Sequence, residues 1–112
     1  MSYRVRVQLQ KGWESTNSKS DSSSSPLTAS ETISLINELR DDSLNYHNSD
    51  DWEEGLNEAI DSSIEWVEGF RGHGYSPSGD GDQHHEYFDY KKDRYRIDIG
   101  TFGGDGDGNW FK

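Results

Sequence analysis

Residues 86–101 read EYFDYKKDRYRIDIGT and have the pattern of a β-hairpin. Aromatic and branched apolar side chains, which favour strands, alternate with charged side chains in the second half. Tyr95 and the two isoleucines that follow it share one face, and the arginines and an aspartate share the other. The pattern predicts strands over about 86–90 and 94–101, joined by a turn at residues 91–93.

The tetrapeptide Gly-Asp-Gly-Asp occurs on both sides of this hairpin, at residues 79–82 and 104–107. Paired strands lie about 4.8 Å apart, so the open ends of the hairpin should bring the two copies together. Carboxylates crowded in this way repel one another unless a cation lies between them. Calcium takes six to eight oxygen ligands, and glycine lets the backbone turn sharply and expose its carbonyls. The sequence therefore predicts a calcium site with the ligands Asp80, Asp82, Asp105, Asp107 and Asn109.

Alternatives to this site remain open. Residues 105–109 copy the first ligand positions of an EF-hand loop, but Trp110 replaces the glycine that should follow, so this is not an EF-hand. Asp and Gly are also common in ordinary turns. A zinc site at His84 or His85 is disfavoured, because neighbouring strand residues face opposite ways and structural zinc prefers thiolates. Carboxylates at a predicted helix start could add calcium ligands, namely Asp50, Asp51 and Glu54.

The first quarter of the chain predicts one strand and one loop. Apolar and polar side chains alternate over residues 3–10, which is typical of a half-buried strand, and Gly12 ends the pattern. The following stretch, at about 15–26, is rich in serine and offers nothing apolar to bury. It therefore predicts a flexible loop.

Two helices are predicted between this loop and the hairpin. Apolar residues recur at helical spacing from a cap at Thr28 or Ser30 to about Tyr46, and then again until just before Gly72. The resulting order is β-α-α-β-β. We expect an α+β fold in which a small three-stranded antiparallel sheet packs against both helices, within a single acidic domain that spans residues 1–112.

The chain is strongly acidic, with 22 acidic and 11 basic residues among 112 and a formal charge of −11. Such a chain repels nucleic acid and anionic membranes, and it attracts cations and basic proteins. Residues 31–70 hold twelve of the acids but a single base, Arg40. Five acids form one stripe along the second predicted helix: Glu54, Glu58, Asp61, Glu65 and Glu68. The stripe indicates either a solvated face or a docking surface for a basic partner, as in an acidic inhibitor, an immunity protein or a DNA mimic.

Several function classes lack support in the sequence. There is no cysteine, which excludes disulfides and thiolate chemistry. No apolar run is long enough to cross a membrane and no signal peptide is evident, so a soluble cytoplasmic protein is expected. Phosphate-loop, nucleophile-elbow and HExxH motifs are all missing, so we do not expect an enzyme.

Small size, strong acidity, lack of cysteine and paired Gly-Asp loops together give a resemblance. The chain resembles the small acidic calcium-binding proteins of heterocyst-forming cyanobacteria, which bind the ion without an EF-hand. This resemblance implies a cytoplasmic calcium buffer that sequesters the ion, with calcium signalling during cell differentiation as its context.

Overall fold

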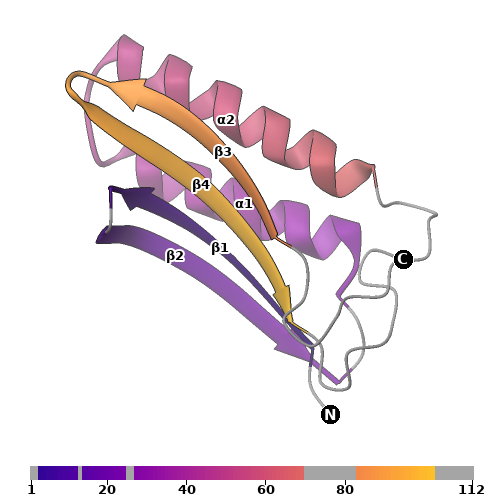
Figure 1. Ribbon diagram of the computed structural model, residues 1–112. Helices are drawn as coiled ribbons and strands as arrows, with labels where there is room; N and C mark the ends of the chain where they lie inside the picture. The colour runs from indigo at the N-terminus through magenta and orange to yellow at the C-terminus, as the bar shows by residue number, and fades with distance from the viewer. Residues whose placement is uncertain (1–2, 13, 25–26, 70–82, 103–112) are drawn as a thin grey trace.

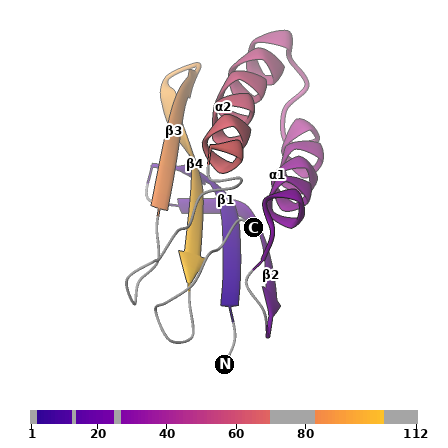
Figure 2. The ribbon, with the colours of Figure 1, turned by 90° about the vertical axis from the view of Figure 1, so that its right-hand side faces the viewer.

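The computed structural model describes residues 3–12, 14–24, 27–69 and 83–102. The elements follow the order β1 (Tyr3–Lys11), β2 (Glu14–Ser23), α1 (Ala29–Leu44), α2 (Asp50–Glu68), β3 (Gln83–Tyr90) and β4 (Asp93–Phe102). The four strands form one antiparallel sheet in the order β2-β1-β4-β3. Both helices lie on the same face of this sheet, α1 against β1 and β2, and α2 against β3 and β4 (Figure 1 and Figure 2). The result is a two-layer α+β fold in which no described element covers the other face of the sheet, which is called the open face below.

The expected three-stranded sheet is wrong, because the serine-rich segment forms a fourth strand. The segment predicted as a flexible loop is β2, which pairs with β1 from Tyr3 opposite Ser23 to Lys11 opposite Glu14. Gly12 turns the chain between them with φ of +60°, a left-handed conformation that suits glycine. The pairing uses backbone groups, which a serine strand supplies as well as any other. Poor strand propensity was therefore overridden by an available partner strand.

Polar contacts hold β2 beneath α1. Asn17 Nδ2 donates to Ser43 Oγ at 3.2 Å, and Lys19 Nζ lies 2.6 Å from the carboxylate of Asp42. This ion pair raises the pKa of Lys19, through the hydrogen bond first and the charge of Asp42 second. An edge strand can therefore be polar on both faces when the helix above it offers partners.

The hairpin at the other end of the sheet follows the sequence pattern. Its strands pair from Tyr90 opposite Asp93 to Gln83 opposite Gly100, somewhat longer than expected, and two lysines make the turn. Lys91 in that turn has a positive φ of 58°. β4 also pairs with β1, with Val7 opposite Ile99. The predicted hairpin is thus confirmed, and it forms one half of the larger sheet.

Both helices begin at side-chain caps. The Thr28 hydroxyl accepts the backbone N–H of Glu31 at 3.1 Å, and the Glu31 carboxylate accepts the Thr28 N–H in return, which completes a capping box. Ser49 caps α2 by accepting the N–H of Trp52 at 3.2 Å. The first helix ends at Leu44, slightly before the predicted Tyr46. Among the described residues, no helix is both long and apolar enough to cross a membrane.

The core lies between the helices and the inner face of the sheet. Alternate residues of β1 and β4 contribute fully buried aliphatic side chains, and each helix contributes one apolar face. Trp52 is at the centre: its indole N–H donates to the Ser43 carbonyl at 2.8 Å. Its ring packs edge-on against Phe88, Tyr90 and Tyr95, with centroids 4.9–5.3 Å away. One aromatic cluster therefore ties the start of α2 to the β3–β4 hairpin.

Candidate binding surfaces

The five predicted calcium ligands, Asp80, Asp82, Asp105, Asp107 and Asn109, lie outside the described residues. The structure describes only the hairpin strands to which the two loops are joined. Gln83 pairs with Gly100, so the strands that lead from the first loop and into the second meet at one end of the ladder. The predicted site itself stays a prediction.

The additional helix carboxylates do not form a metal site with other described residues. Asp50, Asp51 and Glu54 are exposed in the first turns of α2. Within the described ranges, no three His, Cys, Asp or Glu side chains gather closely enough to hold a metal ion. Asp50 and Asp51 instead lie in the first turn of α2, where a carboxylate stabilises the helix dipole.

The two neighbouring histidines face opposite sides of the sheet, as strand geometry predicts. His84 stacks on Trp66 of α2 with ring centroids 4.8 Å apart, and its Nε2 is 2.7 Å from Glu86. His85 lies on the open face, where its Nδ1 is 2.5 Å from Asp98. They therefore belong to different surroundings and cannot share one ion.

The exposed face of α2 carries an acidic stripe. All five predicted members, Glu54, Glu58, Asp61, Glu65 and Glu68, are exposed, and α2 contains eight acids and no base. Arg40 of α1 reaches across to Asp61 at 3.1 Å and to Asn57 at 3.0 Å. One arginine cannot balance this much negative charge, so the surface of the helices has a strong negative potential.

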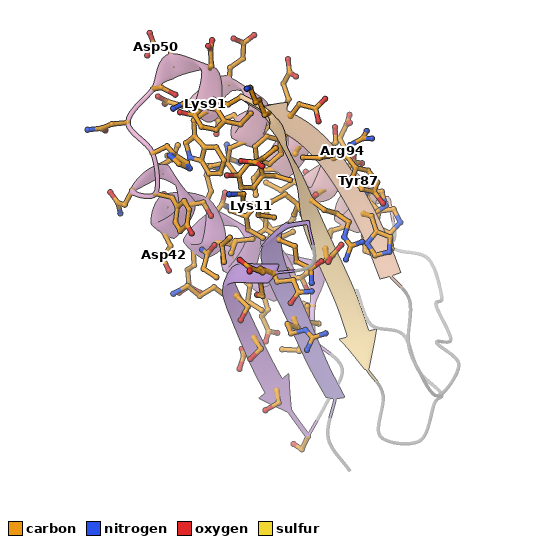
Figure 3. The ribbon with its side chains drawn as sticks, turned by 60° about the vertical axis from the view of Figure 1, so that its left-hand side comes forward. Lys11, Asp42, Asp50, Tyr87, Lys91 and Arg94 are labelled. Carbon is orange, nitrogen blue, oxygen red and sulfur yellow. The ribbon has the colours of Figure 1, made fainter. Side chains whose placement is uncertain are left out.

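A groove runs between the first half of α2 and the β3–β4 turn. Its volume is about 460 Å³, and it is lined by Ser49, Asp51, Glu54, Gly55, Glu58, Asp89, Tyr90 and Lys91. Four of these residues are acids and one is a lysine. Lys91 Nζ lies 5.3 Å from the centre of the Tyr90 ring, so a cation already occupies one aromatic wall. Figure 3 shows Lys91 at this end of the molecule, close to the start of α2 at Asp50.

A glycine in the middle of α2 brings the walls of this groove together. A Cβ atom at Gly55 would lie 2.9 Å from Phe88 Cδ2, closer than real Cβ contacts allow. The missing side chain therefore lets α2 pack directly on β3. The close approach has a cost, because glycine inside a helix is less favourable than alanine by roughly 1 kcal/mol.

The open face of the sheet holds a second polar cluster, around Asp98. This aspartate is only 8% exposed although it faces away from the helices. Its carboxylate accepts a hydrogen bond from Gln8 Nε2 at 3.1 Å, and it lies 2.5 Å from His85 Nδ1 and 2.7 Å from Arg96 Nε. Arg96 also donates to Gln10 Oε1. Three strands thus contribute to one charged network, which the sequence pattern alone did not bring together.

The charge of Arg96 is stabilised by this network. Burial lowers the pKa of Arg96, but the hydrogen bond and negative charge of Asp98 outweigh it, with a further contribution from Tyr87, and the net shift is upward. A neighbouring pair lies further along the same face, where the Arg94 guanidinium sits 4.8 Å from the centre of the Tyr87 ring (Figure 3). The open face is therefore cationic and aromatic where the helical face is acidic.

Part of this cluster was visible in the sequence. The alternation in β4 had already put Arg94, Arg96 and Asp98 on one face. The missing information was the register, which places Gln8 and His85 on either side of Asp98. A single sequence does not supply the offsets between three strands.

Comparisons with protein families, with characterised proteins and with solved structures found no match to this chain.

Proposed function

We propose that this protein is a binding protein whose acidic helical face docks on a basic surface of another protein. The observation that carries the proposal is the segregation of charge: the two helices hold twelve acids and one base, all outside the core. Like charges at helical spacing cost roughly 0.2–0.5 kcal/mol per pair, so the stripe lowers the stability of α2. Docking on a basic partner would relieve that repulsion.

The groove beside the stripe gives this surface a specific feature. Lysine and arginine side chains have a long apolar stem and a cationic head. The groove at α2 offers carboxylates such as those of Glu54 and Glu58 to the cationic head, whereas its aromatic wall, Tyr90, is already covered by Lys91 of this chain. A protruding basic side chain of the partner is therefore the chemistry that it fits. An acidic inhibitor or immunity protein that covers a basic active site is the class of protein that this arrangement supports.

The test asks whether binding depends on the groove or only on the total charge of the protein, and it compares two variants of equal net charge. An oligolysine peptide is the probe, and its affinity is measured by calorimetry at low and at moderate salt. We expect Glu54→Gln with Glu58→Gln to weaken binding on the order of tenfold, since two rim carboxylates are lost. The control, Glu38→Gln with Asp41→Asn on exposed positions of α1, should weaken binding about twofold or less. An equal loss in both variants would show that only the total charge matters.

A second candidate function is calcium buffering in the cytoplasm by the two Gly-Asp loops. It is supported by the pairing of Gln83 with Gly100, which joins both loops to one end of the hairpin. It also agrees with the resemblance to the cyanobacterial calcium-binding proteins. A bound ion must raise the melting temperature, because a ligand of the native state stabilises it. If titration with millimolar calcium gave no heat of binding and no thermal shift, calcium buffering would be ruled out.

Matched variants locate the ion if calcium binds. Asp80→Asn with Asp82→Asn, and separately Asp105→Asn with Asp107→Asn, should each remove most of the calcium-dependent thermal shift. Asp50→Asn with Asp51→Asn changes the charge equally at the start of α2 and should leave the shift in place. Loss of the shift only in the α2 variant would move the site away from the loops.

A further inference from the structure

The strand β3 forms one edge of the described sheet, in which β4 is its neighbour. An edge strand presents backbone N–H and C=O groups that the sheet does not use, and a second extended chain can pair with them. The other edge of the described sheet is β2. The two edges differ, because the acid-lined groove lies between α2 and the end of β3 that includes Asp89 and Tyr90.

The pairing of β4 determines which backbone groups of β3 face outward. The N–H of Gly12 donates to the Arg94 carbonyl at 3.3 Å, so Arg94 turns its backbone groups toward β1 and away from β3. In an antiparallel ladder, two residues directly opposite each other either exchange hydrogen bonds or both turn away. Asp89 is opposite Arg94, and it therefore turns its backbone groups to the edge. The alternation along the strand places those of Tyr87 and His85 there as well.

Strand geometry then determines where the side chains of an added strand would lie. His85, Tyr87 and Asp89 are exposed on the open face, whereas Phe88 and Tyr90 are buried beneath α2. In an added antiparallel strand, the residues that bond to this edge would also place their side chains on the open face, because residues directly opposite share a face. The residues between them would place their side chains on the helical face, next to α2.

Two acids of α2 have a suitable position and spacing for that second set of side chains. The helix runs along β3 in both views (Figure 1 and Figure 2), and Glu54 and Glu58 line the groove between them. Both carboxylates are exposed, and neither makes a hydrogen bond or ion pair with another described residue. One helical turn separates them, a rise of about 6 Å, and alternate residues of a strand are about 6.7 Å apart. Alternate side chains of an added strand therefore match the spacing of these two acids.

We propose that an extended basic segment of the partner adds to the sheet as an antiparallel strand beside β3, with lysine or arginine at alternate positions facing Glu54 and Glu58. This rests on the proposed function and describes the partner of that same surface. Backbone hydrogen bonds at the edge supply affinity, and the carboxylates select the alternate side chains. The order of residues in the partner therefore matters as well as its charge.

Two peptides of equal charge and equal size distinguish strand addition from simple charge attraction. Both alternate lysine and threonine, and one carries N-methyl groups on its threonines whereas the other carries them on its lysines. In the proposed arrangement the threonine N–H groups face β3 and the lysine N–H groups face away. Calorimetry with the full chain compares both with the unmethylated peptide. We expect methylation at threonine to weaken binding on the order of tenfold, through lost hydrogen bonds, and methylation at lysine about twofold or less.

Amide hydrogen exchange of the protein gives a second measurement. The bound, unmethylated peptide should slow exchange at residues 85, 87 and 89 on the order of tenfold, because their N–H groups gain partners. The amides of residues 86 and 88 already bond to β4 and serve as the control in the same strand, where exchange should change about twofold or less.

The outcomes separate this inference from the proposed function. If the two methylated peptides bound equally, and Glu54→Gln with Glu58→Gln still weakened their binding, strand addition would be wrong and the docking surface would stand. The same holds if oligolysine bound but the alternating peptide did not. Failure of both oligolysine and the alternating peptide to bind would overturn the docking surface together with the added strand.

Discussion

The helical face and the open face of the sheet use charge in opposite ways. On the helices, acids outnumber bases by twelve to one, and the stripe from Glu54 to Glu68 stands in solvent. The four strands contain six acids and six bases, and on the open face Asp98 contacts Arg96 and His85. The net charge of −11 is therefore a property of one layer of the molecule. In the sheet, charged side chains largely contact one another and thereby hold neighbouring strands together.

The largest expected effect comes from breaking the core that joins the two faces. Trp52→Ala removes a fully buried indole that contacts three aromatic residues of the hairpin, and it removes the indole N–H that donates to the Ser43 carbonyl. We expect a loss of about 3–5 kcal/mol in the free energy of unfolding, measured by urea denaturation. Tyr87→Ala, which truncates a half-exposed aromatic on the open face, is the control and should cost far less. Similar losses in both variants would show that Trp52 is not the centre of the core.

The next prediction tests whether the charges on the open face stabilise the fold. Asp98→Asn keeps the size of the side chain but removes the negative charge that faces Arg96 and His85. We expect a loss of about 1–3 kcal/mol, the cost of leaving a part-buried charge without its partner. Urea denaturation at neutral pH measures it, with Asp89→Asn at an exposed position of β3 as the control. An unchanged midpoint for Asp98→Asn would mean that this network contributes nothing to stability.

The opposite sign is expected on the helical face. Glu58→Gln with Glu65→Gln removes four like-charge pairs from the stripe, each worth roughly 0.2–0.5 kcal/mol. The free energy of unfolding should therefore rise by about 1–2 kcal/mol at low salt, and the gain should shrink as salt screens the remaining charges. Thermal and urea unfolding at two salt concentrations give the comparison. A loss of stability would mean that these carboxylates make favourable contacts within the fold.

The smallest effect concerns Tyr95 at alkaline pH. Burial raises the pKa of Tyr95, with nearby charges contributing less, so the native protein holds the phenolic proton more tightly than the unfolded chain. The resulting stability is fully present below the unfolded pKa of about 10, and it is lost as the pH rises through the folded pKa. Tyr95→Phe should therefore lose less stability between about pH 8 and about pH 11 than the parent. Parallel urea midpoints for the two proteins would contradict this.

The sequence predicted the elements with strong apolar periodicity. The hairpin around Tyr95, the cap at Thr28 and the first strand appear where the pattern placed them, and the second helix is present but ends at Glu68, before the predicted end near Gly72. Each of these buries one face, and burial imposes a period that can be read from the chain. The acidic stripe was equally predictable, because helical spacing alone determines which side chains share a face.

The strand β2 and the cluster around Asp98 were not predicted, for two different reasons. β2 buries no large apolar side chain, so its only signal was a polar alternation, with serines at 18, 20 and 22 against Asn17, Lys19 and Asp21. The cluster depends on the offset between strands that are distant in the sequence. Gln8 and Asp98 are 90 residues apart, and only their pairing across β1 and β4 reveals the contact.

The serine composition of β2 also affects how the sheet ends. In the described sheet, β2 is an edge strand, and an edge offers unpaired backbone groups to any other strand that meets it. Apolar side chains there would stabilise pairing with such a strand, whereas serine, lysine and aspartate keep the edge hydrated. The same residues contribute little burial, so β2 should exchange its amide hydrogens sooner than β1 or β4. We therefore expect β2 to be less rigid than the inner strands, and we expect its polar side chains to protect this edge from aggregation.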